Sequence, residues 1–331
     1  EDNMELLVAN HSSYPRIGDG AGQQRLRRAY AQHERGEINS QEFDAIQTSV
    51  VQEIVQEQAK AGLDLVTDGQ IRWYDPISHF AGRLDGVKIN GLLRFFNTNF
   101  YIRQPVVVDR VVWKGPVLVE EYRSAQAVSP KPIKVTLTGP YTLGRFSILE
   151  SPRYRDLPEL VADYTDAIMK EVEALAHAGA TLIQIEEPSI LHHPGEAGLV
   201  KVALSRIASR KGSARLLLAT YFGDAEPLYE IMQGFPVDAL GLDFTYSRGL
   251  GDLIARAGSD KAIAFGVIDG RNTRMQPTEE VLPILRSALP KVKGSPSYLT
   301  SSCGLEYLPR DKAGLKLKQM AAVAADLVGR R

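Results

Sequence analysis

Short apolar segments alternate with amphipathic segments along almost the whole chain, and this alternation limits the folds that the chain can adopt. Eight segments have the length and apolar composition of buried strands, and several end in glycine or a polar residue. They cover residues 6–9, 63–67, 133–137, 182–185, 216–220, 239–243, 262–267 and 297–300. Eight strands separated by helices predict an α/β fold of the (β/α)8 TIM-barrel type.

Helical spacing of apolar residues separates most of these segments. The helical ranges are 43–61, 160–178, 199–208, 281–289 and 313–328. Gly62, Gly179 and Gly212 lie just past helix ends, where a left-handed cap favours glycine. A doubly wound open sheet is the alternative architecture, but no Gly-x-Gly-x-x-Gly turn follows the first strand. We therefore expect the barrel.

Residues 74–130 interrupt the alternation. An apparent helical segment at 76–84 precedes two β-like pieces, 99–108 and 110–119, so we predict an insertion containing a hairpin in the second βα loop. Such insertions lie over the carboxyl ends of barrel strands, where catalytic residues gather. We expect residues 4–331 to form one TIM-barrel domain, and residues 1–3, which precede Met4, to be foreign to the natural chain.

The charge balance excludes several classes of partner. The 331 residues carry 39 Lys and Arg against 40 Asp and Glu, so nothing favours nucleic acid or an anionic membrane surface. No apolar run reaches the roughly 18–20 residues that span a bilayer, and the first residues do not resemble a secretory signal. A single cysteine excludes an intrachain disulfide and fits a reducing compartment. We expect a cytoplasmic protein that acts on small molecules.

Polar residues follow nearly every predicted strand, and in a barrel these positions converge on one pocket. Any one of them alone would be interpreted as a helix cap or as part of a surface ion pair, but a ring of them predicts a functional site. The ring comprises His11, Ser13, Asp68, Arg72, Trp73, Asp75, Thr138, Glu186, Glu187, Tyr221, Asp224, Asp243, Tyr246, Asp269, Arg271, Asn272, Ser302 and Cys303.

Glu186 and Glu187 give the strongest local signal in this ring. They follow an apolar run and precede Pro188, which fixes the turn behind them. Because side chains alternate along a strand, the two carboxylates cannot both face the barrel lumen. We expect one to face a ligand amino group, and the other to cap the next helix or hold an arginine.

Three other candidates for the functional site each have two interpretations. The basic cluster Arg16, Arg25, Arg27 and Arg28 suits a polyanionic tail, but a solvated helix face explains it equally well. Arg271 is either a structural arginine, which we favour, or a ligand contact. The aromatic residues Trp73, Phe96 and Trp113 form either a wall for a planar ring or the core of the insertion.

Cys303 is the only thiol, and it lies at a strand end before Gly304. From the residues alone it could be a metal ligand, a nucleophile or a packing residue.

Eight motifs, taken together, resemble the cobalamin-independent methionine synthase family over residues 6 to 310. They are VANHSSYPRIG (8–18), DGQIRWYD (68–75), FNTNF (96–100), TGPYT (138–142), IQIEEP (183–188), TYFG (220–223), GVIDGRN (266–272) and SSCGL (301–305). Long members of that family carry two barrels related by duplication. Their carboxyl-terminal barrel binds zinc and homocysteine, and their amino-terminal barrel helps to hold the polyglutamate tail of methyltetrahydrofolate. Short single-barrel relatives also exist, some of which use methylcobalamin-type donors.

The resemblance implies an incomplete zinc site. The family's catalytic barrel supplies a His-x-Cys pair after the fifth strand, Glu after the sixth and Cys after the eighth. This chain has Ala219 and Tyr221, Asp243, and Cys303 at those places. Zinc needs four ligands, or three plus substrate, so we assign no metal ligand and expect Cys303 to line the pocket. In this respect the motifs resemble the metal-free amino-terminal barrel.

Roles for individual residues follow from the same resemblance. Arg72 stands where the catalytic barrel has an acidic residue, and Glu186 keeps the other acidic position. The expected catalytic residues are Glu186, Tyr221, Asp243 and His11. The expected substrate-binding residues are Ser13, Arg72, Trp73, Asp75, Asn97, Asn99, Arg271 and Cys303. The expected contacts to the tail of a methyl donor are Arg16, Arg27 and Arg28.

The implied function is a methyltransferase of methionine biosynthesis that moves a methyl group from methyltetrahydrofolate or a methylcobalamin-type donor to homocysteine or a related acceptor. One alternative is a non-catalytic folate-binding subunit that partners a separate zinc-bearing barrel, and a corrinoid protein is another conceivable partner. A second alternative is a metal-independent decarboxylase or lyase, suggested by Arg16, Arg72 and Asp75.

Overall fold

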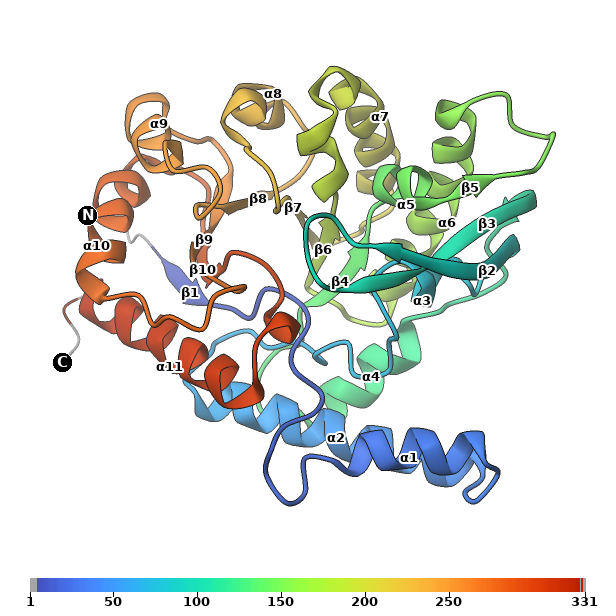
Figure 1. Ribbon diagram of the computed structural model, residues 1–331. Coiled ribbons are helices and arrows are strands. Elements are labelled where there is room, and N and C mark those ends of the chain that lie inside the picture. The colour runs from blue at the N-terminus through green and yellow to red at the C-terminus, as the bar shows by residue number, and fades with distance from the viewer. Residues whose placement is uncertain (1–4, 328, 330–331) are drawn as a thin grey trace.

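A curled parallel sheet forms the centre of the molecule. The computed structural model describes residues 5–327 and 329. Seven strands pair in the order β1-β10-β9-β8-β7-β6-β4, and every pair is parallel (Figure 1). The strands are β1 (Leu6–Val8), β4 (Val135–Thr138), β6 (Leu182–Glu186), β7 (Arg215–Ala219), β8 (Ala239–Asp243), β9 (Ala262–Ile268) and β10 (Ser297–Ser301).

Residues between β1 and β4 close the sheet into a barrel. Leu65 pairs with Ala9 and Val66 pairs with Ile133, both in parallel orientation. The Lys134 amide donates to the Val66 carbonyl at 2.8 Å. The predicted second strand at 63–67 therefore takes its place in the barrel, although it is reduced to two isolated bridges. The predicted (β/α)8 class is confirmed.

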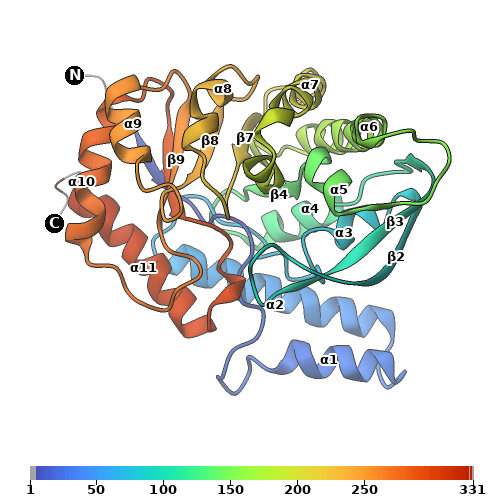
Figure 2. The ribbon, with the colours of Figure 1, turned by 45° about the horizontal axis from the view of Figure 1, so that its top comes forward.

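Helices surround the barrel, as Figures 1 and 2 show. They are α1 (Arg25–Glu34), α2 (Ser40–Lys60), α4 (Val119–Val128), α5 (Pro140–Phe146), α6 (Leu157–His177), α7 (Ala197–Ala208), α8 (Tyr229–Gln233), α9 (Leu250–Ala257), α10 (Thr278–Ala288) and α11 (Arg310–Leu327). Five of them, α2, α6, α7, α10 and α11, match the predicted helical ranges. Asn39 caps α2 reciprocally with Glu42, and Gly62 and Gly179 follow α2 and α6 with positive φ, as the glycine pattern predicts.

The insertion holds an antiparallel pair, but its strands differ from the predicted pieces. The strands are β2 (Asp85–Arg94) and β3 (Tyr101–Val112), preceded by the short helix α3 (Ser78–Ala81) and extended by β5 (Ile148–Leu149). Residues 110–119 do not form a separate strand, because Glu171 on α6 anchors this segment. Its carboxylate accepts hydrogen bonds from the Trp113 indole and from the Val117 and Leu118 amides at 2.7–3.0 Å.

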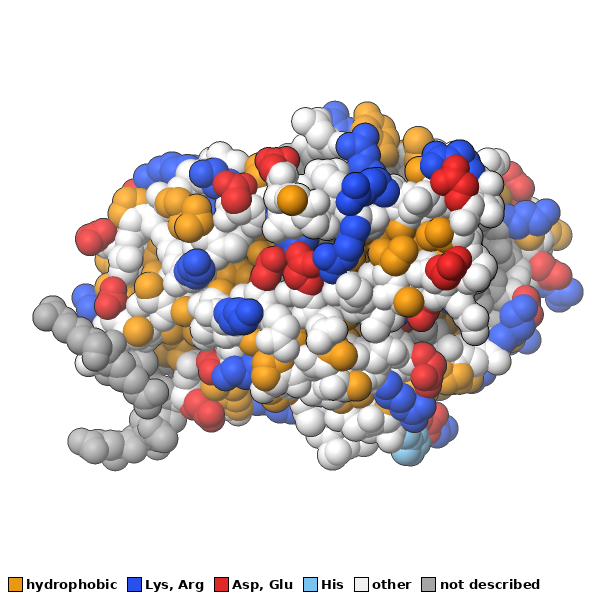
Figure 3. All heavy atoms as spheres, turned by 90° about the horizontal axis from the view of Figure 1, so that it is seen from below, with side chains coloured by type: hydrophobic (Ala, Val, Ile, Leu, Met, Phe, Trp, Pro, Cys, Tyr) orange, Lys and Arg blue, Asp and Glu red, His pale blue; other side chains and the backbone are white. Residues whose placement is uncertain are grey.

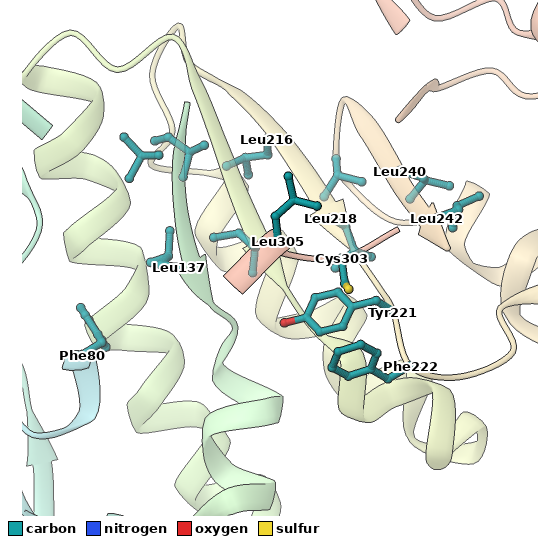
Figure 4. Packing of buried hydrophobic residues seen from close by; sticks show 14 of the residues in the cluster. Phe80, Leu137, Leu216, Leu218, Tyr221, Phe222, Leu240, Leu242, Cys303 and Leu305 are labelled. Atoms are coloured by element: carbon teal, nitrogen blue, oxygen red, sulfur yellow. The ribbon is translucent and has the colours of Figure 1, made fainter. Parts of the chain in front are cut away.

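Side-chain alternation separates the two faces of the barrel strands. Leu216 and Leu218 belong to the large outer core between strands and helices, whereas Leu217 and Ala219 belong to a smaller cluster inside the barrel. Figure 4 shows the outer leucines of β7 and β8. The same alternation on β6 places Gln184 and Glu186 in register with the lumen residues of β7, so these polar groups project into the barrel.

The exterior carries both signs of charge. On the face shown in Figure 3, basic and acidic side chains are interspersed with exposed hydrophobic ones. Among residues 5–327, no helix is long and apolar enough to cross a bilayer. The expectation about residues 1–3 lies outside the described residues.

Two glycines in β2 provide a test of the hairpin geometry. Gly86 and Gly91 both have positive φ, but a Cβ on Gly86 would lie 2.1 Å from the Arg110 carbonyl oxygen, whereas a Cβ on Gly91 would meet nothing within 4 Å. Left-handed backbone costs an alanine about 1–2 kcal/mol. We expect Gly86→Ala to lower the free energy of unfolding by ~2 kcal/mol more than Gly91→Ala, measured by urea denaturation. Equal effects would contradict this packing.

Candidate active site at the barrel mouth

Three predicted catalytic residues meet at the carboxyl ends of the barrel strands. The Tyr221 hydroxyl donates to Glu186 Oε2 at 2.7 Å. His11 Nδ1 lies 3.8 Å from Glu186 Oε1, and the His11 ring packs edge-on against the Tyr221 ring. All three side chains are buried, with at most 5 % of their surface exposed. Strands β1, β6 and β7 thus bring together side chains that lie far apart in the sequence.

Burial sets the protonation of this trio. It lowers the pKa of His11 well below its usual value and raises the pKa of Tyr221 well above it. Burial also raises the pKa of Glu186, against the opposing effects of the Tyr221 and Gln184 hydrogen bonds and the Lys134 charge. Near neutral pH the site therefore offers a neutral imidazole and a protonated phenol beside one carboxyl group.

Glu187 points away from the lumen, as the alternation predicts. Its carboxylate accepts hydrogen bonds from the Tyr141 and Thr142 amides at 2.9 and 2.7 Å, so it caps α5. The capped helix follows the neighbouring strand β4 and is not the next helix in the chain. Glu186 and Glu187 point in different directions, as the sequence argument expected. The helix that Glu187 caps is α5 and not the expected next helix in the chain.

Asp243 lies at the end of β8 with its carboxylate committed to backbone and side-chain donors. Its Oδ1 accepts from the Thr245 amide at 2.8 Å, the Thr245 hydroxyl at 2.6 Å and the Tyr246 amide at 3.2 Å. Its Oδ2 lies 3.4 Å from the Phe222 amide. In this arrangement Asp243 shapes the loops after β7 and β8.

Cys303 is fully buried directly after β10. In Figure 4 its sulfur lies beside the Tyr221 ring. Burial raises the pKa of the thiol well above its usual value, and the negative charge of Asp243 adds to the effect. The group is therefore a protonated packing residue of the pocket wall, and its geometry does not favour a thiolate nucleophile or ligand.

The hairpin turn reaches across the mouth. Asn97 Nδ2 donates to the Tyr246 hydroxyl at 2.8 Å, and Arg271 Nη1 donates to the same oxygen at 2.8 Å. The Arg271 guanidinium also lies over the Phe222 ring, 4.9 Å from its centroid. Asn97 and Arg271 thereby join the insertion to the loops after β8 and β9 (Figure 2).

Aromatic rings fill the space beneath this turn. Phe96 packs against Phe95, Phe146 and Phe222 with ring centroids 4.7–5.8 Å apart, and Phe222 packs against Tyr307 at 5.7 Å. We call these five residues the aromatic roof. Of the aromatic wall considered from the sequence, it contains only Phe96.

Trp73 and Trp113 lie elsewhere. The Trp73 indole donates to Glu121 and stacks on His79 at 4.7 Å, and the Trp113 indole donates to Glu171. Both serve the packing of the insertion against the barrel helices.

Ser13 and Arg16 line one side of the mouth. Both are near Glu306, since burial of that carboxyl group raises its pKa while Arg16 and a Ser13 hydrogen bond lower it. Arg16 Nη2 lies 3.5 Å from Glu306 Oε2, and Arg16 Nη1 donates to the Trp73 carbonyl. Of the three predicted tail-binding arginines, Arg16 alone is near the site.

Several predicted site residues are held away from the trio. Arg72 donates to Gln47 and Thr48 on α2 and pairs with Asp44 there. Asp75 accepts from the Ile77 and Ser78 amides and from the Arg103 amide, so it fixes α3 against β3. Asn99 accepts from Arg94 within the hairpin turn. Arg27 and Arg28 are exposed on α1.

The sequence argument missed polar residues in the lumen itself. Lys134, directly before β4, and Gln184 on β6 lie beneath Glu186, and Gln70 donates to Thr136 at 3.0 Å. A lysine or glutamine inside an apolar strand was the available signal, because an unpaired polar group is costly in a buried strand. Glu306 and Tyr307 carried no comparable signal.

The donor set does not fit zinc. Among residues 5–327 and 329, no three His, Cys, Asp or Glu side chains are grouped so that they could hold a metal ion. Asp243 uses its oxygens for the neighbouring turn, and Tyr221, at the place of a family ligand, is bound to Glu186. We derive no step through a metal.

Comparison with known proteins identifies the family. The family model described as "Cobalamin-independent synthase, Catalytic domain" matches residues 13–326. The chain belongs to the cobalamin-independent methionine synthase family. This membership places it among methyltransferases of the methionine synthase type. The match is to the catalytic-domain model, so the closer likeness to the amino-terminal barrel stays a prediction from the motifs.

Curated relatives agree with this assignment, and a solved structure shows the same fold. A methionine synthase of Saccharolobus solfataricus is 32% identical over 297 residues, covering 89% of this chain and 88% of the relative. One from Sulfurisphaera tokodaii is 33% identical over 298 residues, covering 89% and 86%. The structure of a B12-independent methionine synthase from Shewanella sp. W3-18-1 in complex with selenomethionine superposes with a TM-score of 0.79 at 21% identity, covering 98% of both chains.

The state of Cys303 can be measured directly, because it is the only thiol. We expect the native protein to react with Ellman's reagent at pH 8 at least ~100-fold more slowly than the urea-unfolded chain, since a buried thiol must first be exposed by local opening. Cys303→Ser supplies the blank. A native rate near that of the unfolded chain would contradict a buried, protonated thiol.

Proposed function

We propose that the chain methylates the sulfur of a small amino-acid thiol, homocysteine or a near analogue, at the site formed by Glu186, Tyr221 and His11. The observation that carries this proposal is the Glu186 carboxyl group, which projects into the lumen at the barrel mouth and is held by Tyr221 at 2.7 Å. A carboxylate in a buried site suits the ammonium group of an amino acid. The relatives named methionine synthase support the reaction class.

The chemistry can be written with this chain's own residues. The acceptor thiol loses its proton, its sulfur forms the new S–CH3 bond, and the bond between the methyl carbon and the donor breaks with its electron pair passing to the donor atom. We propose His11 as the acceptor of the thiol proton, because its ring lies 3.8 Å from Glu186 Oε1, whose negative charge can stabilise the imidazolium that forms. Tyr221 orients Glu186 through its hydrogen bond.

We propose methyltetrahydrofolate, or a methylcobalamin-type compound, as the methyl donor. Arg16 is the residue best placed to meet an anionic part of that donor, because it lies beside Glu306 at the mouth. Arg27 and Arg28 are exposed on α1 and would meet only a long tail. The lone buried cysteine suits a reducing compartment, so we keep the cytoplasm as part of the proposal.

The unsuitable zinc donors favour a second candidate function. In it, the chain binds the folate donor without catalysing transfer and acts with a separate zinc-bearing barrel. The decarboxylase or lyase alternative has less support, because Arg72 and Asp75 are engaged with α2 and with the α3–β3 junction, so that Arg16 is the member of its residue set that lies at the mouth.

Activity and metal content together decide between the two candidates. We expect methionine formation from L-homocysteine with methyltetrahydrofolate triglutamate or methylcobalamin, and substoichiometric zinc by mass spectrometry. Glu186→Gln should lower kcat/KM by about 10–100-fold, because it removes a charged partner of the substrate. Glu230→Gln, a change of an exposed carboxylate on α8, should leave it unchanged.

Three other results would count against parts of this proposal. Folate binding without turnover by the chain alone would favour the second candidate. Full activity of Glu186→Gln would exclude the proposed site. Stoichiometric zinc that is lost in Cys303→Ser would overturn the argument from the donor set.

A further inference from the structure

A buried lysine lies directly beneath the proposed site. Lys134 lies directly before β4, and only 2 % of its surface is exposed. Its Nζ donates to Gln184 Oε1 at 2.6 Å and to the His11 carbonyl at 2.7 Å. The Gln184 Nε2 donates in turn to Glu186 Oε1 at 2.8 Å and to the same His11 carbonyl at 3.1 Å. An ammonium group is thus connected to Glu186 through one amide.

We propose that Lys134 is a positioning residue that orients the Gln184 amide and thereby holds Glu186 and His11 in place for an amino-acid substrate. An amide has an accepting end and a donating end, and the two can be exchanged by a flip. An ammonium group can only donate hydrogen bonds. Lys134 is therefore compatible only with the Gln184 orientation that has Oε1 towards it. That orientation directs Nε2 towards Glu186, where a carboxylate needs a donor.

The Glu186 carboxylate and the His11 carbonyl favour the same amide orientation at Nε2, and Lys134 is the group in this contact set that selects it at Oε1. Removal of the lysine would take away the selection at Oε1. A flipped Gln184 would present its oxygen to Glu186. Because two acceptor oxygens would then face each other, the Glu186 carboxyl group would turn away or take up a proton. The His11 carbonyl, which accepts from both Lys134 and Gln184, would lose the donors that fix the first βα loop. The lysine therefore acts on both sides of the proposed site without touching its ligand.

Charge supports the same assignment. Burial lowers the pKa of Lys134 to about 7, and Glu186 opposes that shift. Lys134 in turn opposes the rise in the pKa of Glu186 that burial causes. The titratable groups that face Glu186 from all neighbouring elements are Lys134, His11, Tyr221, Glu306 and Tyr307. Lys134 is the cation in this set, so its removal should raise the pKa of Glu186.

The first test uses the ligand-free protein and does not depend on the proposed function. The Glu186 carboxyl carbon is followed by NMR as pH changes, and Glu186→Gln identifies its signal. We expect Lys134→Met to move the Glu186 titration to higher pH. Lys316→Met is the matched control, because Lys316 is also buried but donates to the Arg274 carbonyl outside the site. We expect it to leave the Glu186 titration unchanged.

A second variant guards against loss of folding in Lys134→Met. Gln184→Glu keeps the length of the side chain and an oxygen partner for Lys134, but it has no donor for Glu186. We expect it to move the Glu186 titration in the same direction. An unchanged titration in a folded Lys134→Met or Gln184→Glu protein would overturn the assignment of Lys134.

The second test concerns the substrate and therefore rests on the proposed function. We expect calorimetry to show L-methionine binding at least ~10-fold weaker in Lys134→Met, with binding of the analogue that lacks the amino group unchanged. If the wild-type protein binds no L-methionine while the NMR shift is present, the proposed acceptor is wrong and the role of Lys134 stands. Equal weakening for both compounds would indicate general damage and would contradict the positioning role.

Discussion

The rest of the site depends on one constraint, which is that the Glu186 carboxyl group is buried in the lumen of a parallel barrel. Removal of a carboxylate from water is costly unless hydrogen bonds and opposite charge replace the lost hydration. Tyr221 supplies a donor directly, and Gln184 supplies another under the control of Lys134. The loop that carries His11 is attached to the same donors. Four strands thus cooperate to keep one acidic group in a single geometry, and any ligand cation must compete with that network.

Periodicity explains which features could be predicted from the sequence. The order of strands and helices, and the opposite directions of Glu186 and Glu187, follow from repeats of 2 and 3.6 residues. The positions of Arg72 and Asp75 do not follow, because both lie in a loop whose course depends on contacts with α2 and β3. The hairpin strands were misplaced for a similar reason, since Glu171, some 55 residues later in the chain, ends the extended segment at Val112.

Whether a site residue could be predicted depends on its position relative to a strand. His11, Tyr221 and Glu186 directly follow or end strands, so the barrel topology alone brings them together. Lys134 and Gln184 were overlooked because the search was confined to residues that follow strands, whereas Lys134 lies directly before β4 and Gln184 lies within β6. A lysine in the apolar run of residues 133–137 is unusual enough to predict a lumen role. Asn97 and Arg271 meet at the Tyr246 hydroxyl and through a direct hydrogen bond from Arg271 to the Asn97 carbonyl, and no local pattern connects residues separated by 174 positions.

The position at which the resemblance implies a metal ligand is connected to the aromatic roof. Tyr221 takes a position where the resemblance places a metal ligand, and its ring packs against Phe222 at 4.8 Å while its hydroxyl binds Glu186. Phe222 adopts a positive φ of 63°, a conformation that is strained for a large side chain, and it connects Tyr221 with Phe96 and Tyr307. Glu186 is only 3 % exposed, and Tyr221 connects it through the Phe222 ring to this roof. The residue at the position of the implied ligand therefore serves both the packing of the barrel mouth and the hydrogen bonding of the buried carboxyl group.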